Sequence, residues 1–323
     1  MEKYLLPFFY SFALSILLIS FLLWIGKKQS LQAIKRFGGV AVILVFVLLV
    51  IFNKDLVMTK PILGILAGGI LILILGLWDD IKSLNWKTQL LFQIAVALTA
   101  ISFGVKSGYI SNPFGSAVNL ENPLVYLPIF TLYFLLFINS LNWLDGIDGL
   151  SGSVSLVVLG TIFLLSFKPE VNQPATAILS AISGGAVLGF LVLNWSPAKI
   201  LAGTTGAWFF GFILASLSIF AGAKIATVLM VAIIPILDFM RVIWERYRAG
   251  QPIFLADKDR HLHFRLLKTG FREKSVVFFV CSASLLIGAA ALYLKASGKL
   301  AIMALVIIIY SFFFIVWPKK QKL

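Results

Sequence analysis

The chain is poor in cysteine, in charged residues and in acidic residues, and each shortage excludes a class of protein. Its 323 residues include one cysteine, Cys281, which excludes an intrachain disulfide and a cysteine metal site. Charged residues make up 12% and apolar residues 60%, against about 25% and about 45–50% in soluble globular domains. A water-soluble fold could not bury this much hydrocarbon, so we expect an integral membrane protein.

The 13 acidic residues face 27 lysines and arginines, which gives a formal net charge of +14. Nucleic-acid binding is one interpretation of such an excess. In membrane proteins, however, basic residues mark cytoplasmic loops and contacts with anionic headgroups. We therefore attribute the charge to membrane topology and expect no nucleic-acid partner.

Apolar runs close to the length of about 20 residues that a spanning helix needs recur along the whole chain. They lie near 4–25, 38–52, 61–78, 88–103, 123–138, 150–167, 175–193, 205–222, 225–243, 275–294 and 298–317. The runs predict an all-α, polytopic membrane protein with about 10–11 transmembrane helices. The first run is too long for a signal-peptide core and ends at a basic stop, so we expect a retained span. No repeat or low-complexity linker divides the runs, and we predict one transmembrane domain over residues 1–323.

Alternate connections between these runs differ in basic residues, with 19 of the 27 lysines and arginines in one set and 8 in the other. The positive-inside rule places the richer set in the cytoplasm and the N-terminus outside. The unusual polar motifs all fall in the richer set. We therefore expect a protein integral to the cytoplasmic membrane whose active site faces the cytoplasm.

Two pairs of aspartates stand at the ends of apolar runs. Asp79 and Asp80 close the third run, with Lys82 two residues further on, and Asp145 and Asp148 follow the fifth. Acidic residues at membrane depth are costly and are functional by default, and paired carboxylates suit Mg²⁺. The alternative for the first pair is a solvated helix end with Lys82 as its partner. The second pair would share one face of a helical turn.

Amide and basic side chains accompany the second pair. Asn142 stands three residues before Asp145, and Asn194 and Lys199 follow the seventh run. A glycine-flanked helix start comes next, and its free backbone N–H groups could bind a phosphate. The alternative is an ordinary helix capped by Thr204 or Thr205.

Both histidines of the chain, His261 and His263, stand in the long basic connection over 241–274. Arg260 and Arg265 flank them. Imidazole and guanidinium groups together suit the binding of a diphosphate. The alternative is a basic loop that rests on anionic headgroups.

These four motifs, taken in order, resemble the polyprenyl-phosphate N-acetylhexosamine-1-phosphate transferases, which include the phospho-MurNAc-pentapeptide translocase. The resemblance covers about residues 71–270. It implies a Mg²⁺-dependent enzyme, with Mn²⁺ as the alternative ion, that transfers a sugar-1-phosphate from a UDP-sugar to polyprenyl phosphate and releases UMP. That step begins lipid-linked glycan synthesis for the cell envelope. The single HLH-type motif is similar to the GlcNAc-1-phosphate branch, which implies UDP-GlcNAc and undecaprenyl phosphate as substrates.

The residues and the resemblance together give a candidate site. Its catalytic residues are four aspartates: Asp79, Asp80, Asp145 and Asp148. The resemblance places the first two at the lipid phosphate, and we expect Asp80 and Asp148 to hold the metal. Substrate binding is assigned to eight residues: Lys82, Asn142, Asn194, Lys199, Arg260, His261, His263 and Arg265.

The chain departs from the family pattern at three places. Thr204 stands where the family has an aspartate that resembles a metal ligand, and Phe264 stands where it has another histidine. The acidic residue before the histidines is shifted, with Asp257 and Asp259 as candidates. A weak or inactive relative that binds lipid phosphate is therefore one alternative. A secondary transporter is another, although the lack of repeats and the acids on one face argue against it. A homodimer is left open.

Overall fold

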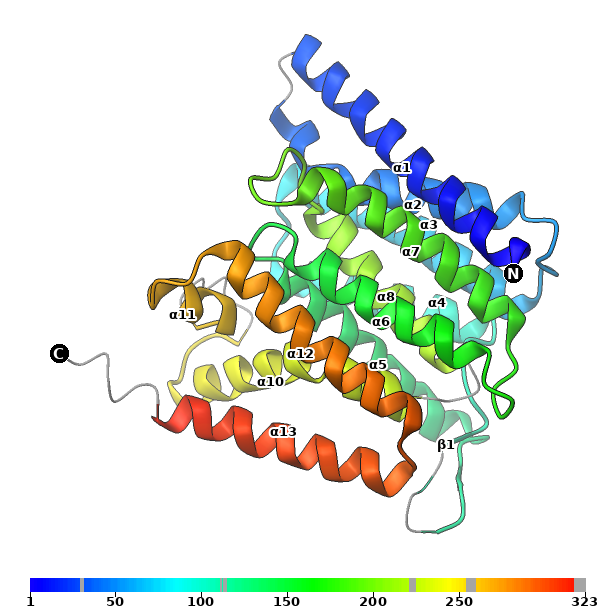
Figure 1. Ribbon diagram of the computed structural model, residues 1–323, viewed down its shortest axis with the longest axis vertical. Coiled ribbons are helices and arrows are strands. Elements are labelled where there is room, and N and C mark those ends of the chain that lie inside the picture. Colours follow the sequence, from blue (N-terminus) through cyan, green and yellow to red (C-terminus); the bar gives the residue numbers. More distant parts are fainter. Residues whose placement is uncertain (30–31, 111, 113–114, 221–224, 254–259, 317–323) are drawn as a thin grey trace.

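The computed structural model describes residues 1–29, 32–110, 112, 115–220, 225–253 and 260–316. Within this part of the chain the fold is a bundle of helices with one small hairpin (Figure 1). The helices are α1 (Glu2–Lys28), η1 (Gln32–Arg36), α2 (Gly38–Ile51), α3 (Lys60–Lys82), α4 (Trp86–Ser102), α5 (Pro123–Leu144), α6 (Leu150–Ser166), α7 (Pro174–Asn194), α8 (Gly203–Phe220), α9 (Ile225–Val231), α10 (Ile233–Arg248), α11 (Leu262–Lys268), α12 (Glu273–Tyr293) and α13 (Ala296–Val316). The hairpin pairs β1 (Tyr109–Ile110) with β2 (Val118–Asn119) in antiparallel register.

Each of the eleven predicted apolar runs coincides with helical structure, which confirms the all-α polytopic fold. Seven helices of the described chain are long and apolar enough to cross a membrane. The ninth run is not one straight span, because α9 and α10 bend by 75° where they meet. Pro235 explains the break, since its ring clashes with the carbonyl of Val231, the last residue of α9. Counted as one broken span, the pair makes an eighth, whereas α2 and α6 are shorter apolar helices.

Helix α8 forms the centre of the bundle. Its aromatic side chains, among them Trp208 and Phe212, are fully buried, and it packs against α2, α3 and α5. Gly211 lets α5 come close, because a Cβ at this position would lie 2.4 Å from the Cα of Ile138. Small residues allow such close helix packing inside membranes, where apolar burial cannot drive it. Helix α8 is therefore packed tightly against α5, and its first residues, Gly203 and Thr204, border the candidate site.

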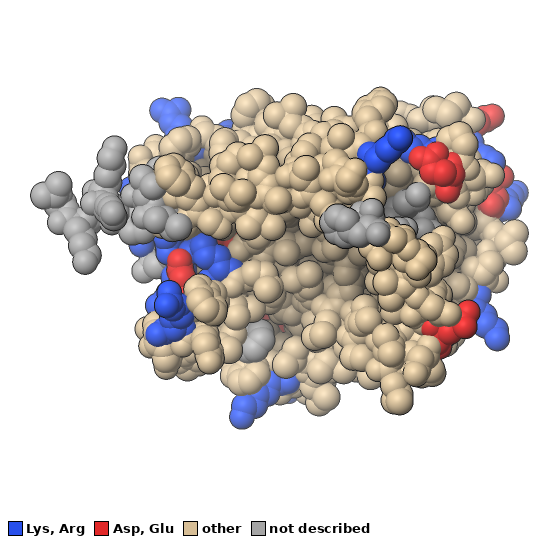
Figure 2. All heavy atoms as spheres, turned by 90° about the horizontal axis from the view of Figure 1, so that it is seen from below, with Lys and Arg blue, Asp and Glu red and all other residues tan. Residues whose placement is uncertain are grey.

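The outer surface of the bundle is apolar. Phe9, Leu132, Phe278 and Ile308 are among the large apolar side chains exposed on it. In the face shown in Figure 2, the charged side chains lie toward the two ends, with a broad band of other residues between them. Such a band suits the hydrocarbon core of a bilayer. The protein is therefore an integral membrane protein.

The two ends of the bundle carry different structures (Figure 1). The hairpin of β1 and β2 lies at one end. The connections from α3 to α4, α5 to α6 and α7 to α8 lie at the other, as does α11. The motifs that the sequence singled out are thus gathered at one end of the molecule.

Candidate functional site

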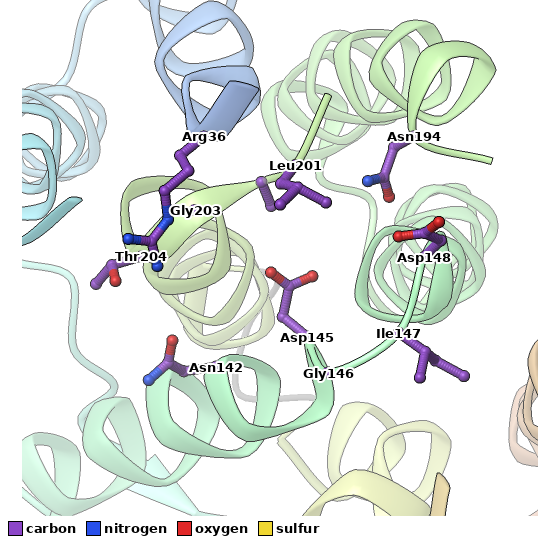
Figure 3. A pocket seen from close by; sticks show the side chains of 11 residues that line it. Arg36, Asn142, Asp145, Gly146, Ile147, Asp148, Asn194, Leu201, Gly203 and Thr204 are labelled. Atoms are coloured by element: carbon purple, nitrogen blue, oxygen red, sulfur yellow. The ribbon is translucent and has the colours of Figure 1, made fainter. Parts of the chain in front are cut away.

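A cavity of about 350 Å³ opens at this end, between the ends of α5 and α7 and the start of α8 (Figure 3). The residues that line it come from four segments of the chain. They are Arg36, Asn142, Asp145, Gly146, Ile147, Asp148, Asn194, Leu201, Ala202, Gly203 and Thr204. Four predicted site residues therefore meet in one cavity: Asn142, Asp145, Asp148 and Asn194.

The turn between α5 and α6 carries both aspartates of the cavity. Helix α5 ends at Leu144, and Gly149 takes a left-handed φ of 77° directly before α6. Glycine adopts this conformation without steric cost. Non-helical backbone at this depth is tolerated where it lines a cavity. The turn brings the Asp145 carboxylate toward the middle of the cavity and Asp148 toward Asn194 (Figure 3).

Asn194 joins this turn to the segment before α8. Its Oδ1 accepts a hydrogen bond from the Gly149 N–H at 3.0 Å, and its Nδ2 donates to the Ile200 carbonyl at 2.7 Å. Asp148 makes a second link, because its Oδ2 accepts from the Ala198 N–H at 2.8 Å. Asn194 is buried and fully engaged by these contacts. In this structure it holds two walls of the cavity together, and its assignment to substrate binding stays a prediction.

Asp79 and Asp80 lie behind the start of α8 and are absent from the cavity lining of the described chain. Asp80 accepts from the backbone N–H groups of Thr204 and Thr205 at 2.7 and 3.1 Å, and from the Thr205 hydroxyl at 2.7 Å. Asp79 accepts from the Thr204 hydroxyl at 2.6 Å. A carboxylate at a helix N-terminus satisfies free N–H groups and favours the helix dipole. Both acids are buried, and they cap α8 from another helix.

Gly203 is needed at this junction. Its φ is +68°, and a Cβ there would lie 2.4 Å from the Arg36 carbonyl oxygen and 2.6 Å from Asp80 Oδ2. A side chain at this position would push α3 and η1 away from α8. The glycine that the sequence suggested as part of a phosphate-binding helix start thus has a packing role.

The histidine motif lies against the turn between α5 and α6. His261 Nδ1 is 2.9 Å from Asp238 Oδ2, and the ring of His263 stacks on that of His261 with centroids 5.5 Å apart. A Cβ at Gly146 would lie only 2.2 Å from His263 Nε2. His263 is buried with neither ring nitrogen bonded within the described chain, and this burial lowers its pKa to about 4. The two histidines therefore pack against the turn that lines the cavity.

The four predicted basic residues lie outside the cavity lining. Arg260 donates to Gln251 Oε1 at 2.6 Å, and Arg265 pairs with Glu245 at 3.0 Å. Lys82 and Lys199 are exposed. Asp257 and Asp259 fall outside the described residues. Contact with substrate stays a prediction for the four basic residues.

Arg36 is the functional candidate that the sequence did not reveal. It is the one lysine or arginine among the described residues that line the cavity. In the sequence it is one of several basic residues after the first apolar run. Only its place two residues before Gly38 and Gly39 sets it apart, because Gly39 lies against Gly206 of α8.

The carboxylates of the cavity suit a divalent ion. Burial, together with the nearby charges of Asp80 and Asp148, raises the pKa of Asp145 to about 6, although a hydrogen bond from Ser151 lowers it. A carboxylate held in this way gains from a cation. The described residues contain no group of three or more acidic, histidine or cysteine ligands. Mg²⁺, however, commonly binds one or two carboxylates and completes its shell with water and phosphate oxygens, and Asp145 and Asp148 fit that pattern. Asp80, which was predicted to hold the metal with Asp148, is engaged at the start of α8, and its metal contact stays a prediction.

Comparison with known proteins agrees with this architecture. The sequence model described as Glycosyl transferase family 4 matches residues 62–222. A Bacillus subtilis (strain 168) protein, the probable undecaprenyl-phosphate N-acetylglucosaminyl 1-phosphate transferase, is 29% identical over 84% of this chain and 76% of its own length. The decaprenyl-phosphate N-acetylglucosaminephosphotransferase of Mycobacterium tuberculosis (strain CDC 1551 / Oshkosh) is 28% identical over 76% and 68%. A phospho-N-acetylmuramoyl-pentapeptide-transferase of Prochlorococcus marinus is 28% identical over 74% and 71%. The polytopic chain, with its acidic cavity at one end of the bundle, belongs to glycosyl transferase family 4.

Proposed function

We propose that the protein transfers N-acetylglucosamine-1-phosphate from UDP-N-acetylglucosamine to undecaprenyl phosphate and releases UMP. The observation that carries the proposal is the cavity that brings Asn142, Asp145 and Asp148 together at one end of a membrane-embedded bundle. Relatives that act on polyprenyl phosphates and N-acetylglucosamine support it. The connections that carry the predicted motifs hold most of the lysines and arginines, which favours a cytoplasmic site with the N-terminus outside.

The chemistry asks for positioning more than for covalent work by the protein. An oxygen of the acceptor phosphate attacks the phosphorus that carries the sugar. The bond from that phosphorus to the bridging oxygen breaks, and UMP leaves with the electron pair. A phosphate monoester is largely ionised at neutral pH, so the attack needs no strong base.

The protein groups would divide this work between them. Bound Mg²⁺, or Mn²⁺ as the alternative, would neutralise diphosphate charge, and Asp145 and Asp148 would hold it. The amide of Asn142 lines the same cavity and would orient a phosphate or sugar oxygen. Asn194 would keep the two walls at a fixed separation through its bonds to Gly149 and Ile200.

The direct test is UMP release by the purified protein in detergent with undecaprenyl phosphate, Mg²⁺ and a panel of UDP-sugars. We expect release that requires the lipid and UDP-N-acetylglucosamine. Asp148→Asn should lower it by about 10²-fold or more, the loss typical for a charge-stabilising group. Asp55→Asn, which changes an exposed loop carboxylate, is the matched control. No release with any sugar from folded protein would contradict the proposal.

Binding without transfer is the second candidate, and Thr204 favours it. Thr204 offers no carboxylate to the cavity, and its hydroxyl is engaged by Asp79. Thr204→Asp separates the two functions. A large gain in UMP release would indicate a degraded metal site in a binding protein, whereas a loss or no change would indicate a rearranged catalytic site.

A further inference from the structure

The cavity contains one cationic side chain, and it points inward. Figure 3 shows the guanidinium of Arg36 beside Thr204, with Asn142 and Asp145 on the facing walls. The side chain is exposed to the cavity. Its guanidinium acts on Asp80 through charge, but it has no hydrogen-bond or ion-pair partner among the described residues. A guanidinium carries five N–H donors, so this group is free to bind an anion.

The backbone around Arg36 is fixed to the neighbouring segment that leads into α8. The Lys35 carbonyl accepts from the Leu201 N–H at 2.6 Å, and the Leu201 carbonyl accepts from the Gly38 N–H at 3.0 Å. Gly39 donates to the Ala202 carbonyl at 3.0 Å. These bonds tie η1 and the start of α2 to the segment that leads into α8. The arginine is therefore held over the cavity by a built framework rather than by a free loop.

The charges around the cavity explain what such a cation would do. Asp145 and Asp148 repel a phosphate, and the two arginines that flank the histidines, Arg260 and Arg265, are engaged elsewhere. A planar guanidinium matches phosphate oxygens in a bidentate manner that an ammonium cannot reproduce. Thr204 matters here too, because a carboxylate at this place would pair with the guanidinium and neutralise it.

We propose that Arg36 binds the diphosphate of the nucleotide-sugar donor, an assignment that rests on the proposed transferase function. Arg36 supplies fixed positive charge on the side of the cavity away from the two aspartates. The donor diphosphate lies between them. Thr204 keeps the guanidinium unpaired until the donor arrives.

The test measures the binding of inorganic pyrophosphate, the smallest diphosphate, by calorimetry in detergent with EDTA. Wild-type protein is compared with Arg36→Met and Arg36→Lys. Lys27→Met is the matched control, because it removes the same charge from an exposed position at the end of α1. We expect Arg36→Met to bind about tenfold or more weakly, the loss typical of a charged hydrogen bond. Arg36→Lys should lie between, and Lys27→Met should stay within about twofold of wild type.

Two results would overturn the assignment: no pyrophosphate binding by wild type, or equal affinities in Arg36→Met and Lys27→Met. Thermal melting of each variant checks folding, and the exposed Arg36 side chain should tolerate replacement. UMP release from the same preparations reports on the transferase reaction separately. Arg36-dependent pyrophosphate binding without UMP release would contradict the transferase function and leave the anion site standing.

Discussion

Gly146 and His263 lie so close together that no side chain fits between them: a Cβ on Gly146 would lie 2.2 Å from His263 Nε2. Gly146→Ala should therefore push α11 away from the turn between α5 and α6, at a cost of about 1–3 kcal/mol for overpacking. Thermal unfolding in detergent measures the cost, and UMP release should fall with it. Gly160→Ala is the control, because nothing lies within 4 Å of its Cβ position.

A double variant checks the cause of the Gly146→Ala effect. If the contact with His263 is responsible, His263→Ala in the Gly146→Ala background should recover part of the lost stability. The recovery is partial because the Phe264 ring would still lie 2.9 Å from the new Cβ. Additive losses in the double variant would show that the alanine acts through another contact.

Asp80→Asn should lower the thermal stability of the protein as well as its activity. The carboxylate accepts three hydrogen bonds from Thr204 and Thr205, and an amide would turn its NH₂ group toward one of those donors. The loss of an N-terminal helix cap is typically about 0.5–2 kcal/mol. Asp148 lines the cavity, so Asp148→Asn should lower the activity with a smaller loss of stability than Asp80→Asn. Equal melting temperatures for wild type and Asp80→Asn would contradict the capping role.

Thr204→Asp should make stability depend on a divalent ion. The new carboxylate would face Asp79, whose oxygen now accepts from the Thr204 hydroxyl at 2.6 Å, and like charges at this range repel. In EDTA the variant should melt below Thr204→Asn, its uncharged counterpart. Added Mg²⁺ should raise the melting temperature of Thr204→Asp more than that of Thr204→Asn. The same rise in both variants would show that the ion binds elsewhere.

His263 should make stability fall as the solution becomes acidic. Burial lowers its pKa to about 4 in the folded protein, against about 6.5 in an unfolded chain. The unfolded state therefore binds more protons between these values, so stability is lost as the pH falls from about 6.5 toward 4. Melting temperatures of wild type and His263→Asn between pH 7.5 and 5 measure the effect. The variant should show a smaller fall, and parallel curves would assign the pH dependence to other groups.

Apolar runs were enough to predict the helices, because most runs in this chain are long. The bend between α9 and α10 was missed, since Pro235 alone does not distinguish a kinked span from two helices. The number of domains and the homodimer stay predictions.

The site was predicted in part. Asn142, Asp145 and Asp148 were predicted as site residues because they stand close together in sequence, among the glycines after the fifth apolar run. The capping of α8 by Asp79 and Asp80 could not be read from spacing, because the partners are 125 residues apart. Arg36 was missed for the same reason, since its place over the cavity depends on backbone bonds to Leu201 and Ala202.

The distance in sequence between the two acids of α3 and their partners in α8 also has a consequence for biosynthesis. The ribosome completes α3 long before it makes α8, so both carboxylates enter the membrane without the donors that later bind them. In that interval only water and nearby cations can stabilise their charge. Their position on the last turn of α3, close to Lys82, keeps them at the membrane surface, where hydration is available. The same pair one or two turns deeper in α3 would be surrounded by hydrocarbon until α8 is inserted. Because the two acids stand at the end of α3 instead, the fold is compatible with stepwise insertion of its helices.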